Sequence, residues 1–249
     1  VEAGLFGSTK ALLMVPPEPK ALALLIAGGQ GNLQLKGSDG MVAMGPLQWN
    51  FLVRSRAHFH KRDIAVLLVD SPNGRPMTYM DRTSATSHFQ SLIEKAIARS
   101  PVLKDLPVWG VATSAGSISL AAWVNAAPER LSGAVFTAPI TRGVAPGAWG
   151  PANPQGIASK PLRFSKPVLV VVAANDACSE TPPGDAEMLL SRFEASTRKQ
   201  AVMIQNAGNP AGNPAGNPAG DPCQAQSPHG FWDVEDETVG RIVDFMLAQ

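Results

Sequence analysis

The sequence predicts an α/β protein in which a mostly parallel sheet is covered by helices. Short apolar segments alternate along the chain with longer amphipathic ones, the pattern that parallel strands and their connecting helices produce. Segments such as Ile64–Val69 contain no polar residue, which is typical of strands buried on both faces. A composition with 45% hydrophobic and 16% charged residues is that of a globular protein.

The alternation indicates a sheet of about seven to eight strands flanked by helices. The apolar segments read as strands are Leu12–Val15, Leu22–Ile26, Ile64–Val69, Val108–Ala112, Gly133–Thr137, Val168–Ala174 and Ala201–Gln205. The amphipathic segments read as helices are Leu47–His60, Ser84–Arg99, Ser117–Ala126, Ala186–Ser196 and Val234–Leu247.

Two regions fit neither pattern. Pro139–Pro167 is rich in Gly, Pro and Ala, and we expect an irregular surface excursion there, too poor in periodic apolar residues for a large lid. Ala207–Pro222 repeats Ala-Gly-Asn-Pro, with Asp221 in place of Asn in the last unit, which predicts a low-complexity loop of successive turns. With one carboxylate it lacks the several oxygen ligands that calcium requires. We expect residues 1–249 to form a single domain.

The net charge and the length of the apolar runs exclude some kinds of binding partner. A net charge of +1 gives no electrostatic reason to expect binding to nucleic acid. The longest apolar runs, Ala21–Ala27 and Pro167–Ala174, are too short to span a membrane.

The chain opens with Val1 and without an apolar signal core. Removal of a signal peptide from an export precursor would leave such a start, so we expect an exported, periplasmic or secreted protein. A monomer is the favoured oligomeric state.

The most informative segment runs from a strand into a helix through a serine. In Ala112-x-Ser114-x-Gly116 the serine is flanked by small residues, as a sharp strand-to-helix turn requires where strand and helix nearly touch. Ala112 stands where the usual pattern has Gly. Such a turn would present Ser114 above the sheet edge as a nucleophile; an ordinary strand-helix turn is the alternative.

A base and an acid follow in a consistent order. A serine needs a base to act as a nucleophile near neutral pH, and the base needs an orienting carboxylate. Asp176 follows the strand Val168–Ala174, at the end where open α/β sheets place their sites. His229 lies in a loop directly before the last helix, whereas the other three histidines lie within or near the end of earlier helices.

A glycine-rich loop after the strand Leu22–Ile26 offers backbone donors for an oxyanion. The expected pair is the N–H of Gln30 (or of Gly29) with that of Ala115. Gly29-x-Gly31 also begins a dinucleotide-binding fingerprint, but Gln34 occupies the third glycine position and no helical pattern follows at once. We therefore expect neither cofactor nor metal.

With these residues in place, the chain resembles the α/β-hydrolase superfamily, and more narrowly the small exported bacterial α/β-hydrolases. The resemblance rests on Phe51–Arg56 (Phe-Leu-Val-Arg-Ser-Arg), on an Asp-x-Cys-x-x-x-Pro-Pro segment at 176–183, and on His229-Gly230-Phe231. It implies an α/β-hydrolase fold without a large lid, with Ser114 as nucleophile, Asp176 as acid and His229 as base. It supplies no substrate.

With the acid and the base assigned, the two cysteines lie close to them in the sequence. Cys178 lies two residues after Asp176, and Cys223 lies six before His229. We expect a disulfide that ties the acid loop to the base loop, in keeping with an oxidising compartment. Two buried thiols are the alternative.

The function expected from these residues is that of a serine esterase. A carboxylesterase acting through an acyl-enzyme on small or surface-presented esters is favoured. An amidase or peptidase with the same triad and a non-catalytic binding protein on the same scaffold are the alternatives.

Overall fold

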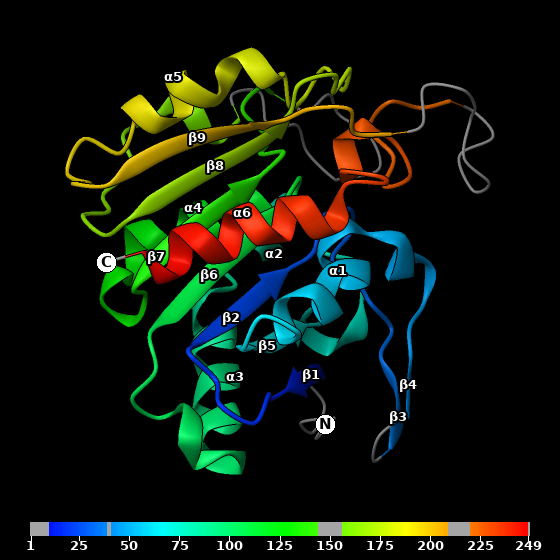
Figure 1. Ribbon diagram of the computed structural model, residues 1–249, viewed down its shortest axis with the longest axis vertical. Coiled ribbons are helices and arrows are strands. Elements are labelled where there is room, and N and C mark those ends of the chain that lie inside the picture. The colour runs from blue at the N-terminus through cyan, green and yellow to red at the C-terminus, as the bar shows by residue number, and fades with distance from the viewer. Residues whose placement is uncertain (1–9, 39–40, 144–155, 209–219, 249) are drawn as a thin grey trace.

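A seven-stranded sheet forms the centre of the computed structural model, which describes residues 10–38, 41–143, 156–208 and 220–248 (Figure 1). The strands lie in the order β1-β5-β2-β6-β7-β8-β9; β1 is antiparallel to β5 and the other neighbours are parallel. Their bounds are β1 Ala11–Met14, β2 Ala21–Ile26, β5 Ile64–Val69, β6 Val108–Thr113, β7 Gly133–Thr137, β8 Val168–Ala173 and β9 Lys199–Ile204. The mostly parallel α/β architecture predicted from the sequence is confirmed.

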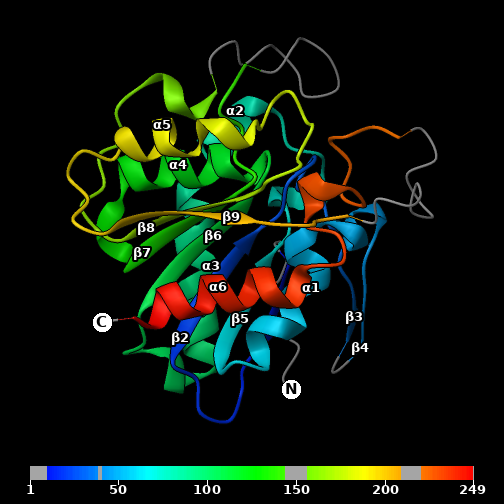
Figure 2. The ribbon, with the colours of Figure 1, turned by 45° about the horizontal axis from the view of Figure 1, so that its top comes forward.

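Helices cover both faces of the sheet (Figure 2). On one face lie α1 and α6, and on the other lie α3, α4 and α5, with the short α2 against α4. Their bounds are α1 Phe51–His60, α2 Tyr79–Thr83, α3 Thr86–Arg99, α4 Gly116–Ala126, α5 Ala186–Ser191 and α6 Glu235–Leu247. Each face has its own hydrophobic core, because successive side chains of a strand point to opposite faces. In β2, Leu22 and Leu24 belong to one core, Ala23 and Leu25 to the other.

The predicted strands and helices are all present, with shifted ends. The helix expected over Leu47–His60 is divided at Asn50, whose extended backbone ends a short 3₁₀ turn (Pro46–Trp49) and whose side chain accepts a hydrogen bond from the N–H of Leu52 at the start of α1. The helix expected over Ala186–Ser196 ends at Ser191.

Three short elements were not predicted. The hairpin β3 (Lys36–Ser38) and β4 (Met41–Ala43) has three residues in each strand, and α2 has five. Elements this short carry too little hydrophobic periodicity to be recognised.

The region after β7 differs from the expected surface excursion. Residues 144–155 lie outside the described part, but the flanking segments contain large side chains packed into the core. Ile140, Leu162 and Phe164 are each less than 5% exposed. The described segments are irregular apart from a 3₁₀ turn, Ile157–Ser159. Apolar residues spaced without period can therefore be buried, so the surface placement was wrong for these positions.

The Ala-Gly-Asn-Pro array falls largely outside the described residues. Its first two residues, Ala207 and Gly208, and its last three, Gly220 to Pro222, are described. The loop expected over Ala207–Pro222 therefore stays a prediction for residues 209–219.

We expect Phe164→Ala to lower the free energy of unfolding by about 3–5 kcal/mol, because a buried ring would leave a cavity. Urea denaturation measures this change, with Lys160→Ala, at an exposed position, as the control that stays within about 0.5 kcal/mol of wild type. A Phe164→Ala protein as stable as the control would contradict the burial described above.

Candidate active site

Ser114 occupies the turn between β6 and α4 in a left-handed backbone conformation, with φ of 49°. This conformation is costly for a residue with a Cβ, at about 1–2 kcal/mol, so the surroundings must hold it. The N–H of Ser114 donates to the carbonyl of Thr137 at the end of β7, at 3.0 Å. The strained turn is therefore fixed to the neighbouring strand.

Two glycines allow the turn to approach the end of β2. A Cβ on Gly116 would lie 2.4 Å from the carbonyl oxygen of Ile26, and one on Gly28 would lie 2.9 Å from the Cβ of Ser114. Neither contact is sterically possible. Strand and helix nearly touch at Gly116, as the small residues around the serine predict. Ala112 is a fully buried residue of β6.

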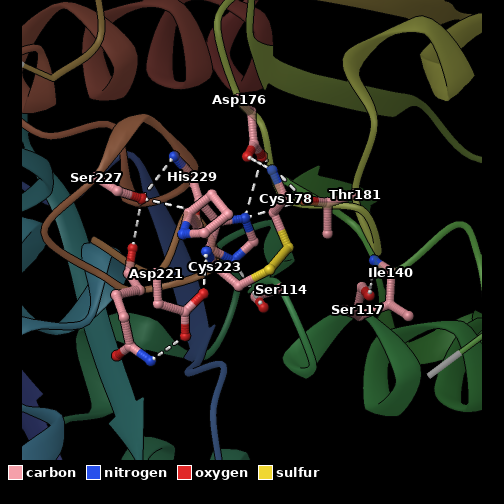
Figure 3. A network of polar contacts seen from close by, with 12 residues as sticks. Ser114, Ser117, Ile140, Asp176, Cys178, Thr181, Asp221, Cys223, Ser227 and His229 are labelled. Atoms are coloured by element: carbon pink, nitrogen blue, oxygen red, sulfur yellow. Dashed lines mark hydrogen bonds and ion pairs between the residues drawn. A yellow bond between two sulfur atoms is a disulfide. The ribbon is translucent and has the colours of Figure 1, made fainter. Parts of the chain in front are cut away.

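His229 lies between Ser114 and Asp176 (Figure 3). It sits in a 3₁₀ turn, Pro228–Gly230, between β9 and α6. Its Nε2 is 3.0 Å from Ser114 Oγ, and its Nδ1 is 3.1 Å from Asp176 Oδ2. The side chains of His229 and Asp176 are 5% and 1% exposed. The structure therefore brings together three residues that are distant in sequence, in the order serine, imidazole, carboxylate.

Both oxygens of the Asp176 carboxylate have donors. Oδ1 accepts from the N–H of Cys178 at 2.8 Å, and Oδ2 accepts from Thr181 Oγ1 at 2.9 Å. A carboxylate oxygen accepts hydrogen bonds, so a neutral His229 that donates to Asp176 Oδ2 carries its proton on Nδ1, and its Nε2 can accept the proton of Ser114.

Thr181 is a site residue that the sequence did not reveal. Its Oγ1 is 3.0 Å from His229 Nδ1 as well as 2.9 Å from Asp176 Oδ2, so the hydroxyl touches both partners of the acid–base pair. Thr181 lies inside the Asp-x-Cys-x-x-x-Pro-Pro segment, but a lone hydroxyl in a turn carries no signal for its direction. The fold of residues 176–181 creates the contact.

A disulfide joins Cys178 and Cys223, beside His229 and Asp176 (Figure 3). It links the loop that carries Asp176 to the loop that carries His229. The two cysteines are 45 residues apart, and closing a loop of this size stabilises a fold by about 4 kcal/mol in the chain-entropy account. One covalent bond therefore limits how far the acid and the base can separate.

Arg54 is a second residue that holds the loop carrying His229. Its guanidinium donates to the carbonyls of Gly230 and Ala225, at 2.5 and 3.3 Å, and to Glu235 Oε1 at 2.7 Å. It also lies 4.9 Å from the ring centre of Trp232. Burial lowers the pKa of Arg54, and the bond to Glu235 partly opposes this shift. The resemblance had marked the segment containing Arg54 without giving it a role; these contacts hold the chain on both sides of His229.

A cavity of about 510 Å³ opens above Ser114 and His229, a size common for small-molecule sites. Gly29 and Gln30, from the loop after β2, line it together with Ser114. Ala115 follows Ser114 at the start of α4 and is 4% exposed. Of the two predicted donor residues, Gln30 therefore lines the same cavity as Ser114 and Ala115 follows Ser114 in the chain, and their role stays a prediction.

Two of the other three histidines and two other carboxylates are engaged elsewhere. The third, His60 at the end of α1, has a buried Nε2 without a hydrogen-bond partner in the described part of the chain. His58 pairs with Asp236 at 2.8 Å, and His88 contacts the carbonyl of Asp70 at 3.2 Å. The Asp70 carboxylate accepts backbone N–H groups, and Asp185 is held by Arg142 and Thr141. Within the described residues, no group of three or more His, Cys, Asp or Glu is arranged to hold a metal ion.

No family model matches the sequence, and a comparison with curated proteins found no match. Solved structures do match. An alpha-beta serine hydrolase homologue from Coxiella burnetii gives a TM-score of 0.57 at 12% identity, over 96% of this chain and 92% of that one. The chain has the α/β-hydrolase fold.

Two esterases share this α/β-hydrolase fold with the chain. Est1E from Butyrivibrio proteoclasticus gives a TM-score of 0.57 at 14% identity, over 99% of this chain and 97% of that one. Esterase 2 from Thermogutta terrifontis, solved phosphorylated by paraoxon, gives 0.59 at 13% identity, over 96% and 89%. These likenesses extend over nearly the full length of the chain.

Thr181→Val would keep the shape of the side chain and remove its hydroxyl. We expect the free energy of unfolding to fall by about 1–3 kcal/mol, because a buried carboxylate loses a donor, and Ser114 to react about tenfold more slowly with a fluorophosphonate. Urea denaturation and mass spectrometry measure the two changes. Thr181→Ser restores the hydroxyl and should behave like wild type. Equal behaviour of the Val and Ser variants would show that the hydroxyl has no effect.

Proposed function

We propose that the protein is a serine hydrolase that cleaves carboxylic esters through an acyl-enzyme. The observation that carries the proposal is the unbroken set of contacts from Ser114 Oγ through His229 to Asp176, with distances of 3.0 and 3.1 Å. These distances are within the hydrogen-bond reach that a nucleophile and its base require. The esterases with the same fold support the reaction class.

In the first step Ser114 Oγ bonds to the carbonyl carbon of the ester while its proton passes to His229 Nε2. The carbonyl π electrons move to oxygen and give an oxyanion. When the carbonyl re-forms, the bond to the alcohol oxygen breaks, and His229 returns the proton to that oxygen. Water then repeats the sequence on the acyl-enzyme and releases the acid. Asp176 holds the imidazole of His229 in place. It also stabilises the positive charge that the imidazole carries between the proton transfers.

The oxyanion needs donors close to Ser114. The backbone N–H of Ala115 and that of Gln30 fit this role, because one follows the serine at the start of α4 and the other belongs to the loop that lines the cavity. Removing one such donor from a serine hydrolase lowers turnover by about 10²–10³-fold.

The cavity suggests esters with a modest, uncharged acyl or alcohol group. Leu47, Trp49 and Phe51 supply an apolar wall, whereas Glu180 and Asp221 contribute carboxylates. In the described part of the chain no lysine or arginine lines the cavity. Small esters and esters displayed on a polymer are therefore the proposed substrates, with neutral ones preferred.

Export is the location that the disulfide supports. Disulfides persist in oxidising compartments, and Cys178 and Cys223 are bonded. Among the described residues no helix is long and apolar enough to cross a membrane. We infer a periplasmic or secreted enzyme.

We expect Ser114→Ala to abolish hydrolysis of aryl esters, by at least about a thousandfold in turnover, and to lose fluorophosphonate labelling. Ester and matching anilide substrates of graded acyl length, measured side by side, separate an esterase from an amidase. Ser191→Ala, on the exposed end of α5, is the control and should keep full activity. Full activity in Ser114→Ala would place the nucleophile elsewhere.

We expect Glu180→Gln to improve the use of an ester with a carboxylate on its acyl chain, relative to its neutral analogue. Removing one repulsion of about 1 kcal/mol corresponds to about fivefold in kcat/KM. Burial raises the pKa of Glu180, so in wild type the discrimination should fade as pH is lowered and Glu180 becomes neutral.

The ratio of kcat/KM for the two esters, followed against pH, tests this prediction, because the protonation of His229 affects both substrates alike. Glu187→Gln, in the first turn of α5 and away from the cavity, is the control. A ratio in Glu180→Gln equal to that of wild type at every pH would show that Glu180 does not act on the substrate charge.

A further inference from the structure

Arg82 is a fully buried arginine behind the glycine-rich loop. It lies in α2, between β5 and α3, and is 1% exposed. It does not line the cavity. Neither the sequence pattern nor the proposed chemistry assigns it a role.

A buried guanidinium is costly unless its charge is compensated. In the described part of the chain no carboxylate pairs with Arg82 at 4.0 Å or less, and its Nε has no hydrogen-bond partner. Burial lowers the pKa of Arg82 to about 10, so the side chain is still charged at neutral pH. The compensation must come from neutral dipoles.

These dipoles are the carbonyl groups of the loop that follows β2. Nη2 of Arg82 is 2.6 Å from the carbonyl oxygen of Gly29, and 3.4 and 3.5 Å from those of Ala27 and Gly28. Nη1 is 3.5 Å from Ser119 Oγ in α4. Three successive carbonyls thus face one cation.

The contact at Gly29 determines where the N–H of Gln30 points. In a planar trans peptide the carbonyl and the following N–H point in opposite directions, and no described peptide is cis. Since the Gly29 carbonyl faces the interior, the Gln30 N–H is directed away from Arg82. The carbonyl of Gln30 accepts from the N–H of Met77 at 2.8 Å, so one peptide of Gln30 is held by α2 and the other by the segment that leads into it.

Gly31 provides the room for this arrangement. A Cβ there would lie 2.9 Å from Met77 Sδ and 3.2 Å from Arg82 Nη2. Gly31 also has φ of 68°, a conformation that glycine adopts at little cost. A side chain at position 31 would therefore require Met77 or Arg82 to shift.

We propose that Arg82 is the positioning residue of the oxyanion hole: its guanidinium, bonded to the Gly29 carbonyl, aims and polarises the Gly29–Gln30 peptide so that the Gln30 N–H receives the oxyanion. The inference rests on the proposed ester hydrolysis and adds a residue to it. A cation bonded to the carbonyl withdraws electron density from the peptide and strengthens its N–H as a donor. The effect is exerted mainly on the transition state, where the negative charge develops.

The test uses the full-length oxidised protein, an aryl ester and an aryl trifluoromethyl ketone. The ketone accepts Ser114 Oγ at its carbonyl carbon, the serine proton passes to His229, and the carbonyl oxygen becomes a stable oxyanion. Arg82→Lys keeps the charge but loses the fork, and Arg82→Gln loses both. Complete removal of an oxyanion donor lowers turnover by about 10²–10³-fold. Arg82→Gln only loosens the donor, so we expect its kcat to fall about 10- to 100-fold. The kcat of Arg82→Lys should lie between that of Arg82→Gln and that of wild type.

Two substitutions of Ser119 form a matched pair of variants that leave Arg82 itself unchanged. Ser119→Asp gives Nη1 of Arg82 a carboxylate, which should draw the cation from the loop while compensating its charge, so this variant should fold even where Arg82→Gln does not. Ser119→Ala removes the weak contact and should keep wild-type kcat. Circular dichroism and thermal melting identify the folded variants.

We expect kcat to fall and the Ki of the ketone to rise by the same factor in Arg82→Lys and in Ser119→Asp. KM and the Ki of the product alcohol should stay unchanged, which a general loss of structure would not produce. Folded variants with wild-type kcat and ketone Ki would overturn the role of Arg82, as would equal weakening of ketone and alcohol. A wild-type protein that neither cleaves esters nor reacts with a fluorophosphonate would overturn the proposed function, and this inference with it.

Discussion

The site depends on the close contact between the start of α4 and the end of β2. Gly116 lies so near the carbonyl of Ile26, and Gly28 so near Ser114, that no side chain fits at either position. This proximity forces the turn at Ser114 into its left-handed conformation and brings the glycine-rich loop beside the serine. The buried sheet supplies the rigidity, since both strands are covered on both faces. Packing of backbone against backbone is therefore what sets the serine and its donors in one place.

The acid and the base come from loops, and each loop is held by more than its own backbone. The disulfide ties the two loops together, Thr181 touches both ionisable groups, and Arg54 grips the carbonyls around His229. Arg82 does the same for the loop after β2. In both arginine contacts a partly or fully buried guanidinium faces several main-chain carbonyls, so one side chain holds several peptide groups at once. The site is thus rigid in segments that have no regular secondary structure.

The features that could be predicted from the sequence are those whose pattern has a local cause. The buried strands, the small residues around Ser114 and the order of Ser114, Asp176 and His229 could all be read from spacing and residue type. The contacts of Thr181, Arg54 and Arg82 could not, because they join segments far apart in the chain and depend on the direction of a side chain. The same limit explains the core positions after β7. Ile140 and Phe164 are buried by long-range packing, which leaves no period in the sequence.

The two ends of the Ala-Gly-Asn-Pro array are anchored independently of its length. At one end the N–H of Gly208 donates to the carbonyl of Trp232 at 2.6 Å, and at the other Cys223 is bonded to Cys178. A gain or loss of whole units would therefore change the chain between two fixed points, and loop closure costs only about 0.6 kcal/mol for each doubling of length. This protein carries its repeat where such drift in length leaves the distance between Asp176 and His229 untouched.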